Sequence, residues 1–242
     1  MRSIVVRAGL VALVAANTIA SAGIGRASEI PKPVPRPSHE IGATPTPTSL
    51  DRPTLLPPPS GPVQTFSFGR VILLRGLMNV FSRGLDALKI EMKQRGLPVE
   101  LYNHTAWTEV ADKLIQEHKT NKNLEPIILI GHSLGADASV VMANWLAEHG
   151  VSVRLVITLD GVGDGLTAAA GSAEVINYYK PHQFGQEILA SKAFRGTITN
   201  IDLSDHPDIG HLNIEKNPDL HNQIITKVLE IMKKKPTVTA KR

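Results

Sequence analysis

The 242-residue sequence contains no cysteine. Its folded part therefore cannot be held together by disulfide bonds, and no cysteine is available for attachment of a lipid. With 42% hydrophobic residues, the chain is long and apolar enough to bury a sizeable core. We expect a globular protein that is stabilised by this core alone.

Clustered basic charge is also scarce. The formal net charge is +4, and outside the carboxyl end the basic residues are scattered along the chain. This distribution gives no reason to expect a nucleic-acid partner. We expect the basic tail at residues 236–242 to be solvated, with peripheral contact to an anionic envelope surface as the alternative.

Residues 1–27 have the pattern of a secretory signal peptide. Two arginines within the first seven residues flank an apolar, uncharged run at 8–25, and small residues then allow cleavage after Ala22 or after Ala27. The run is short and contains polar residues, so it fits a cleaved leader better than an uncleaved membrane anchor. We therefore expect a periplasmic or secreted protein.

Proline is concentrated in one segment, because eleven of the seventeen prolines lie between Pro31 and Pro62. Such a stretch favours extended polyproline II conformations and cannot build a packed core. We interpret residues 28–64 as a disordered linker, with a tether that holds the next domain away from the envelope as the alternative. The globular domain is expected over residues 65–235.

Strand-like and helix-like patterns alternate from residue 66 onward. Strands are expected at 70–74, 98–102, 126–131, 152–160, 174–180 and 196–204, and helices at 83–96, 106–119, 133–148 and 218–234. This alternation predicts an α/β fold with a mostly parallel sheet of about six strands and helices on both faces. Ser82 precedes the first helix and is a candidate N-cap.

The segment Gly131-His132-Ser133-Leu134-Gly135 lies where the third strand meets a long helix. A sharp turn there exposes the serine above the sheet, and glycines on both sides let the neighbouring backbone pass close to it. The helix also directs its N-terminal amides toward the place where negative charge would develop. We interpret Ser133 as a nucleophile, with a structural serine in a tight turn as the alternative.

These residues resemble those of the α/β-hydrolase family, which includes serine esterases, lipases and thioesterases. The resemblance covers about residues 71–232 and implies catalytic residues in the chain order Ser, then Asp or Glu, then His. The family places the histidine between the last strand and the last helix. His211 follows a glycine there and is the preferred candidate, with His206 and His221 as alternatives.

The resemblance leaves the acid less sharply defined. Many relatives carry it after the strand that corresponds to 174–180, but the residues that follow here, up to Gln183, include no carboxylate. Thioesterase domains are among the members that use the preceding strand, after which Asp160 stands in this chain. Asp160 would then orient His211 and stabilise its imidazolium form. The alternatives are Asp164, Asp202 and Asp205, or a turn role for Asp160 itself.

The resemblance further implies an oxyanion hole made of two backbone N–H groups. One would belong to Leu134, and the other to Leu77 or Met78 in the loop after the first strand. Relatives often begin this loop with His-Gly, whereas this chain has Arg-Gly. Asn79 and Ser82 are candidates for bracing the loop, although capping a helix is the simpler role for Ser82.

The expected activity is that of a serine hydrolase acting on an ester or thioester through an acyl-enzyme on Ser133. No metal or cofactor is implied. The connections after the fourth and fifth strands are too short for a large cap domain, which favours an open site for a small-molecule or lipid-like acyl ester. The alternative is a catalytically inactive hydrolase-fold protein that serves as an exported envelope-binding or scaffold module.

Overall fold

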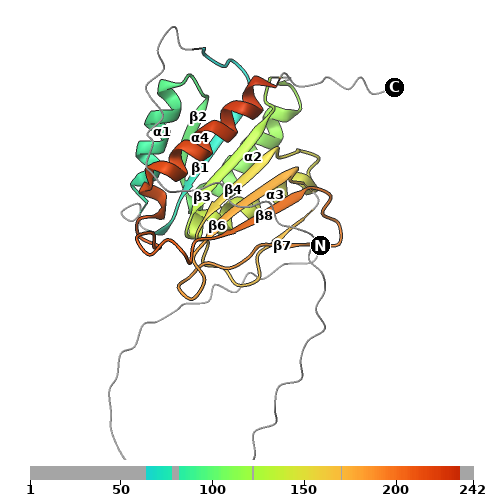
Figure 1. Cartoon of the computed structure of the whole chain (residues 1–242). Helices are drawn as coiled ribbons and strands as arrows, with labels where there is room; N and C mark the ends of the chain where they lie inside the picture. Colours follow the sequence, from blue (N-terminus) through green and yellow to red (C-terminus); the bar gives the residue numbers. More distant parts are fainter. Residues whose placement is uncertain (1–63, 78–81, 122, 170, 235–242) are drawn as a thin grey trace, which may run out of the picture. The chain divides into compact units, whose positions relative to one another are not determined.

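The computed structural model describes residues 64–77, 82–121, 123–169 and 171–234 (Figure 1). The expected signal peptide at 1–27, the linker at 28–64 apart from its last residue, and the basic tail at 236–242 lie outside these residues and stay predictions. Met78 and Asn79 also lie outside them. Among the described residues, no helix combines the length and apolar composition that crossing a membrane requires.

The central sheet has six strands in the order β2-β1-β3-β4-β6-β8. Their bounds are β1 Arg70–Arg75, β2 Val99–Asn103, β3 Ile127–His132, β4 Leu155–Leu159, β6 Glu174–Tyr179 and β8 Thr197–Asp202. Every pairing between them is parallel, so their carboxyl ends lie along one edge of the sheet. The expected parallel sheet is confirmed, and this edge is where α/β proteins carry their sites.

Four α-helices cover the sheet: α1 Gly84–Gln94, α2 Trp107–His118, α3 Leu134–Glu148 and α4 Pro218–Lys233. Because successive side chains of a strand point to opposite faces, Val71 and Leu73 of β1 pack with α1 and α4, whereas Ile72 and Leu74 pack with α2 and α3. Figure 1 shows α4 across the front of the sheet and α2 and α3 behind it. Helices therefore lie on both faces, as predicted.

Two short strands were not predicted from the sequence. β5 (Thr167–Ala168) and β7 (Leu189–Ala190) lie in the connections after β4 and β6 and pair with each other in parallel. Two residues are too few to produce an alternating pattern of apolar and polar residues, so the sequence carried no signal for them. Within the described residues, these connections hold no large cap domain.

Ser82 does not cap α1, so the N-cap prediction is wrong. The residue before the helix is Arg83, which has a helical conformation and makes no side-chain cap hydrogen bond. The hydroxyl of Ser82 bonds instead to the loop after β1 and to the last residue of β3. Long-range hydrogen bonds thus override the local preference of serine for a helix start.

Candidate active site

The carboxyl end of β3 leads into a sharp turn at Ser133 before α3 begins at Leu134. Ser133 has φ 58° and ψ −127°, a conformation that costs a non-glycine residue on the order of 1–3 kcal/mol. Its backbone is held there because its N–H donates to the Leu159 carbonyl oxygen at 3.0 Å and its own carbonyl accepts from Ala136 N–H at 2.9 Å. The turn places the Ser133 side chain at the carboxyl edge of the sheet.

Three glycines allow the backbone to crowd around this turn. A Cβ atom on Gly131 would lie 2.0 Å from the Gly135 carbonyl oxygen, and one on Gly135 would lie 2.0 Å from that of Leu74. A Cβ atom on Gly76 would lie 2.8 Å from Ser133 Cβ. The end of β3, the start of α3 and β1 therefore pack closely together at this turn, and the loop after β1 packs closely against the serine itself.

The structure brings three predicted side chains together at this edge. Ser133 Oγ lies 3.1 Å from His211 Nε2, and His211 Nδ1 lies 2.6 Å from Asp160 Oδ2. A carboxylate can only accept, so Nδ1–H of His211 donates to Asp160, and Nε2 of the neutral ring is free to accept from the serine hydroxyl. This is the tautomer that a general base for Ser133 requires.

The alternative histidines make other contacts. His206 presents its backbone carbonyl to the Lys180 ammonium at 2.6 Å. His221 lies in α4, where its Nδ1 is 3.2 Å from Glu91 Oε1 and its Nε2 donates to the backbone carbonyl of Glu215 at 2.8 Å. The structure thus places His211, of the three candidates, against Ser133.

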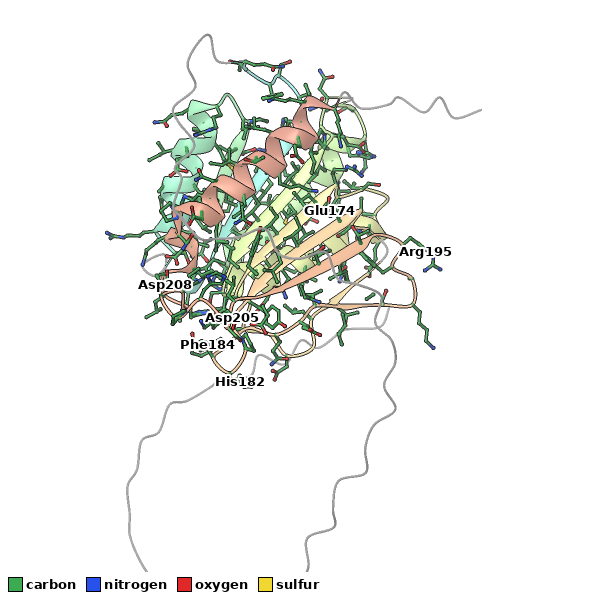
Figure 2. The ribbon with its side chains drawn as sticks, viewed as in Figure 1. Glu174, His182, Phe184, Arg195, Asp205 and Asp208 are labelled. Atoms are coloured by element: carbon green, nitrogen blue, oxygen red, sulfur yellow. The ribbon has the colours of Figure 1, made fainter. Side chains whose placement is uncertain are left out.

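The alternative acids are likewise bonded elsewhere or lie at the surface. Asp164 accepts from Gln186 Nε2 at 2.8 Å, and Asp202 accepts from the backbone N–H of Ser204 at 2.7 Å. Asp205 is exposed in the loop after β8, at the same end of the sheet as the site (Figure 2). Of the four candidates, the structure places Asp160 against His211.

Asp160 directly follows β4 and is fully buried. Its φ of 48° turns the chain sharply, and its N–H donates to the Tyr178 carbonyl oxygen at 2.8 Å. Oδ1 accepts from the backbone N–H of Lys180 at 2.8 Å, which leaves Oδ2 for His211. Both carboxylate oxygens are therefore fixed in place.

Lys180 stands where many relatives carry the acid, and it has a different role here. Besides its backbone bond to Asp160, its buried ammonium group donates to the backbone carbonyls of Leu203 at 2.8 Å and His206 at 2.6 Å. These carbonyls belong to the segment that runs from β8 to His211. Lys180 thus ties the acid to the histidine loop, which sequence reasoning missed because it considered this position only for the carboxylate it lacks.

The loop after β1 is braced from two sides. Gly76 N–H donates to Ser82 Oγ at 2.9 Å, and Nδ1 of His104 lies 3.1 Å from the Gly76 carbonyl oxygen, to which it can only donate. Arg75, at the position where relatives often have histidine, pairs with Asp86 of α1, with Nε 3.3 Å from Oδ2. Of the two residues predicted to brace this loop, Ser82 contacts it, whereas Asn79 lies outside the described residues.

The candidate oxyanion donors lie on two sides of the serine. Leu134 is the first residue of α3, so its N–H is one of the helix-terminal donors that have no partner within the helix. Leu77 follows Gly76, whose backbone packs against Ser133. Met78, the other candidate, lies outside the described residues.

Residues 74–184 match the family described as lipase, class 3. The matched segment covers just under half of the chain and contains the turn at Ser133 and Asp160. The chain has an α/β-hydrolase fold. The matched segment ends before His211, so the position of this histidine comes from the structure and not from the family match.

Three solved structures are similar to this chain in fold alone. A cutinase-like protein from Cryptococcus sp. is 12% identical, with a TM-score of 0.45, and the match covers 70% of this chain and 98% of that one. The type II thioesterase BorB from the borrelidin biosynthetic cluster is 10% identical, with a TM-score of 0.45 and coverage of 69% and 92%. Est1E from Butyrivibrio proteoclasticus is 12% identical, with a TM-score of 0.41 and coverage of 68% and 90%. A comparison with curated proteins finds no significant match.

Exposed apolar side chains lie beside the triad that Ser133, His211 and Asp160 form. Leu77, Phe184 and Leu212 are 51%, 58% and 59% exposed. The ring of Phe184 has its centroid 4.6 Å from that of His211, and Leu212 directly follows this histidine. Figure 2 shows Phe184 at the lower end of the sheet, whereas Glu174, the first residue of β6, lies toward the other end. The carboxyl edge that holds the triad therefore has an apolar rim.

The residue before Ser133, His132, is buried behind the site with 1% of its surface exposed. Its Nε2 lies 2.8 Å from the His211 carbonyl oxygen and its Nδ1 lies 2.9 Å from Ser82 Oγ. Burial lowers the pKa of His132 to about 4, although the hydrogen bond to the His211 carbonyl opposes this effect. His132 is therefore neutral near pH 7. The sequence motif gave no signal for this role, because the position is variable within it.

We expect the folded chain to lose stability as the pH falls from about 6.5 to about 4. His132 takes up a proton near its ordinary pKa of 6.5 in the unfolded chain, but only near pH 4 in the folded one. Protonation therefore favours unfolding, so this contribution is complete above pH 6.5 and is lost as the pH falls through the folded pKa. A shift of this size corresponds to roughly 3 kcal/mol.

Urea unfolding at pH 7 and pH 4.5 measures this loss, with His132→Gln as the comparison because glutamine does not titrate. The variant should lose less stability between the two pH values than the wild type. The comparison matters because burial raises the pKa of Glu215, which changes stability in the opposite direction. Equal losses in the two proteins would contradict the expectation.

Proposed function

We propose that this α/β-hydrolase is a serine hydrolase that cleaves an ester or thioester bond through an acyl-enzyme on Ser133. The observation that carries the proposal is the continuous line of contacts from Ser133 Oγ through the His211 ring to the buried carboxylate of Asp160. The match to class 3 lipases over residues 74–184 supports hydrolysis of an ester.

In the proposed reaction, His211 Nε2 accepts the proton of Ser133 as Oγ attacks the carbonyl carbon of the substrate. The negative charge that develops on the carbonyl oxygen is stabilised by the backbone N–H groups of Leu134 and of Leu77 or Met78. Asp160 stabilises the imidazolium and holds its ring in place.

The tetrahedral intermediate then collapses. The bond to the leaving alcohol or thiol breaks, and this group takes the proton from His211, which leaves the acyl group on Ser133. Water attacks the acyl-enzyme as His211 removes its proton. The carboxylic acid departs, the proton returns to Ser133 Oγ, and the enzyme is restored without a metal or cofactor.

The substrate proposed for this site is a small-molecule or lipid-like acyl ester. Leu77, Phe184 and Leu212 offer apolar surface beside the triad, against which a hydrocarbon chain can bury area that a small polar substrate cannot. Export of the enzyme to the periplasm or the medium is part of the proposal and rests on the sequence of residues 1–27.

Labelling with a small fluorophosphonate tests the proposal. Such probes form a covalent bond with an activated serine, and peptide mapping by mass spectrometry locates the adduct. We expect the full chain to carry the adduct on Ser133 and His211→Ala to carry none, because Oγ is a weak nucleophile without its base. His206→Ala is the matched control and should label like the wild type. Absence of the adduct on a folded wild-type protein would overturn the proposal and favour an inactive hydrolase-fold scaffold.

A further inference from the structure

A line of three hydrogen bonds passes behind Ser133. Gly76 N–H donates to Ser82 Oγ at 2.9 Å, Ser82 Oγ lies 2.9 Å from His132 Nδ1, and His132 Nε2 lies 2.8 Å from the carbonyl oxygen of His211. The line joins the loop after β1, the residues before α1, the end of β3 and the histidine loop. We call these four residues the relay.

Only one arrangement of hydrogen atoms satisfies every bond of the relay. The carbonyl of His211 can only accept, so the hydrogen of the neutral His132 ring lies on Nε2. Nδ1 then carries a lone pair, and the Ser82 hydroxyl must donate to it. The oxygen of Ser82 keeps a lone pair for Gly76 N–H. Each bond therefore fixes the direction of the next.

The burial of the relay makes each of these bonds costly to lose. Ser82 is 0% exposed and His132 is 1% exposed. A buried polar group that loses its partner retains the full cost of its removal from water. A protonated His132 would carry hydrogen on both ring nitrogens and could not accept from Ser82, but burial lowers its pKa to about 4 and keeps the ring neutral.

The two ends of the relay lie on the loop that carries a candidate oxyanion donor and on the residue proposed as the general base, which must both flank Ser133 during catalysis. At one end, the backbone of Gly76 packs against Ser133 Cβ and leads to the N–H of Leu77. At the other end, the bonded carbonyl belongs to His211, whose ring also packs at 5.1 Å between centroids against that of His132.

We propose that His132 is a positioning residue that sets the loop of the oxyanion hole and the His211 loop at a fixed separation around Ser133. This inference rests on the proposed function, since it assigns a role in that reaction. His132 touches neither the substrate nor Ser133 Oγ in this role; it acts through Ser82 and through the backbone of His211. Displacements of about 1 Å in such groups can lower a rate about 100-fold.

The test compares His132→Ala, His132→Gln and Ser82→Ala in the full chain, with a short-chain p-nitrophenyl ester as the probe substrate. We expect His132→Ala to lower kcat about 10- to 100-fold per folded molecule, with KM changed less than about twofold. The amide of glutamine can reach the His211 carbonyl, so His132→Gln should recover part of this loss. Because Ser82 and His132 act in one line, the double variant should lose less than the product of the single losses.

The matched control is His221→Gln. His221 is also buried and its Nε2 also donates to a backbone carbonyl at 2.8 Å, but this carbonyl belongs to Glu215, outside the site. We expect this variant to lose stability and keep kcat. If His132 contributed to stability alone, its variants would also lose stability and keep kcat.

Three outcomes are distinguishable. If folded His132 variants keep kcat within about twofold while the wild type is active, the positioning role is overturned and the proposed function stands. If the wild type neither hydrolyses the ester nor takes up the fluorophosphonate, the proposed function fails, and with it this role. Should His132→Ala not fold, His132→Gln and Ser82→Ala decide, because each removes only part of the relay.

¹⁵N chemical shifts of His132 in the wild type should show hydrogen on Nε2; hydrogen on Nδ1 would overturn the relay independently of activity.

Discussion

Ser133→Ala should abolish ester hydrolysis by this chain, with kcat falling on the order of a million-fold. In the proposed mechanism, the variant removes the oxygen that forms the acyl-enzyme, and His211 then has no hydroxyl to activate. The fold should persist, because the Ser133 hydroxyl bonds to His211 and the turn itself is held by backbone bonds to Leu159 and Ala136. Hydrolysis of a p-nitrophenyl ester, together with circular dichroism, measures both effects.

Ser172→Ala is the matched control for this prediction. Ser172 is also a buried serine, but it lies just before β6, at the opposite end of that strand from the triad, where it bridges to Val153. We expect its variant to keep the wild-type kcat. If Ser133→Ala retained more than about 1% of the activity while folded, another group would be the nucleophile and the acyl-enzyme proposal would be wrong.

The sequence predicts the inner strands of the sheet well because they are largely buried on both faces. All six residues of β3 are buried, and a continuous apolar run of that length between turns has few other interpretations. The turn at Ser133 can also be predicted from the sequence, since Gly131 and Gly135 lie within two residues of the serine. Local patterns of this kind specify where a strand ends and a helix begins.

The contacts that hold the site together cannot be predicted from local sequence patterns in the same way. Ser82 lies 50 residues from His132, and His132 lies 79 residues from the carbonyl that it binds. Serine before a helix and histidine inside a motif each have an ordinary local interpretation, and only the folded chain shows the partner that overrides it. Lys180 is a second example, because its ammonium acts on carbonyls 23 and 26 residues further along the chain.

The position of the acid shows how the sheet limits the alternatives. β4 and β6 are neighbours, with Leu159 opposite Tyr178, so the residues that follow these strands lie side by side. Parallel strands are about 4.8 Å apart, a distance that one side chain can span. Asp160 can therefore reach His211 from the end of β4. Lys180 follows β6, where many relatives carry the acid, and its backbone N–H supports the Asp160 carboxylate.

This geometry makes Asp160→Asn a sharp test of the triad. Lys180 N–H is directed at Oδ1, so the amide of the variant will turn its oxygen to that N–H and its NH₂ group to His211. Nδ1 of His211 must then accept, and its hydrogen moves to Nε2, where it faces Ser133 Oγ. The ring can no longer accept the serine proton, so we expect kcat to fall about 10⁴-fold with the fold retained.

The wrong tautomer is observable apart from activity, because ¹⁵N chemical shifts of His211 should show hydrogen on Nδ1 in the wild type and on Nε2 in Asp160→Asn. Asp164→Asn is the control, since Asp164 is exposed and bonds to Gln186; it should leave both kcat and the tautomer unchanged. A folded Asp160→Asn variant with kcat within tenfold of the wild type would mean that another carboxylate orients His211. Asp205, which is exposed in the histidine loop at the same edge of the sheet, would then be the next residue to replace.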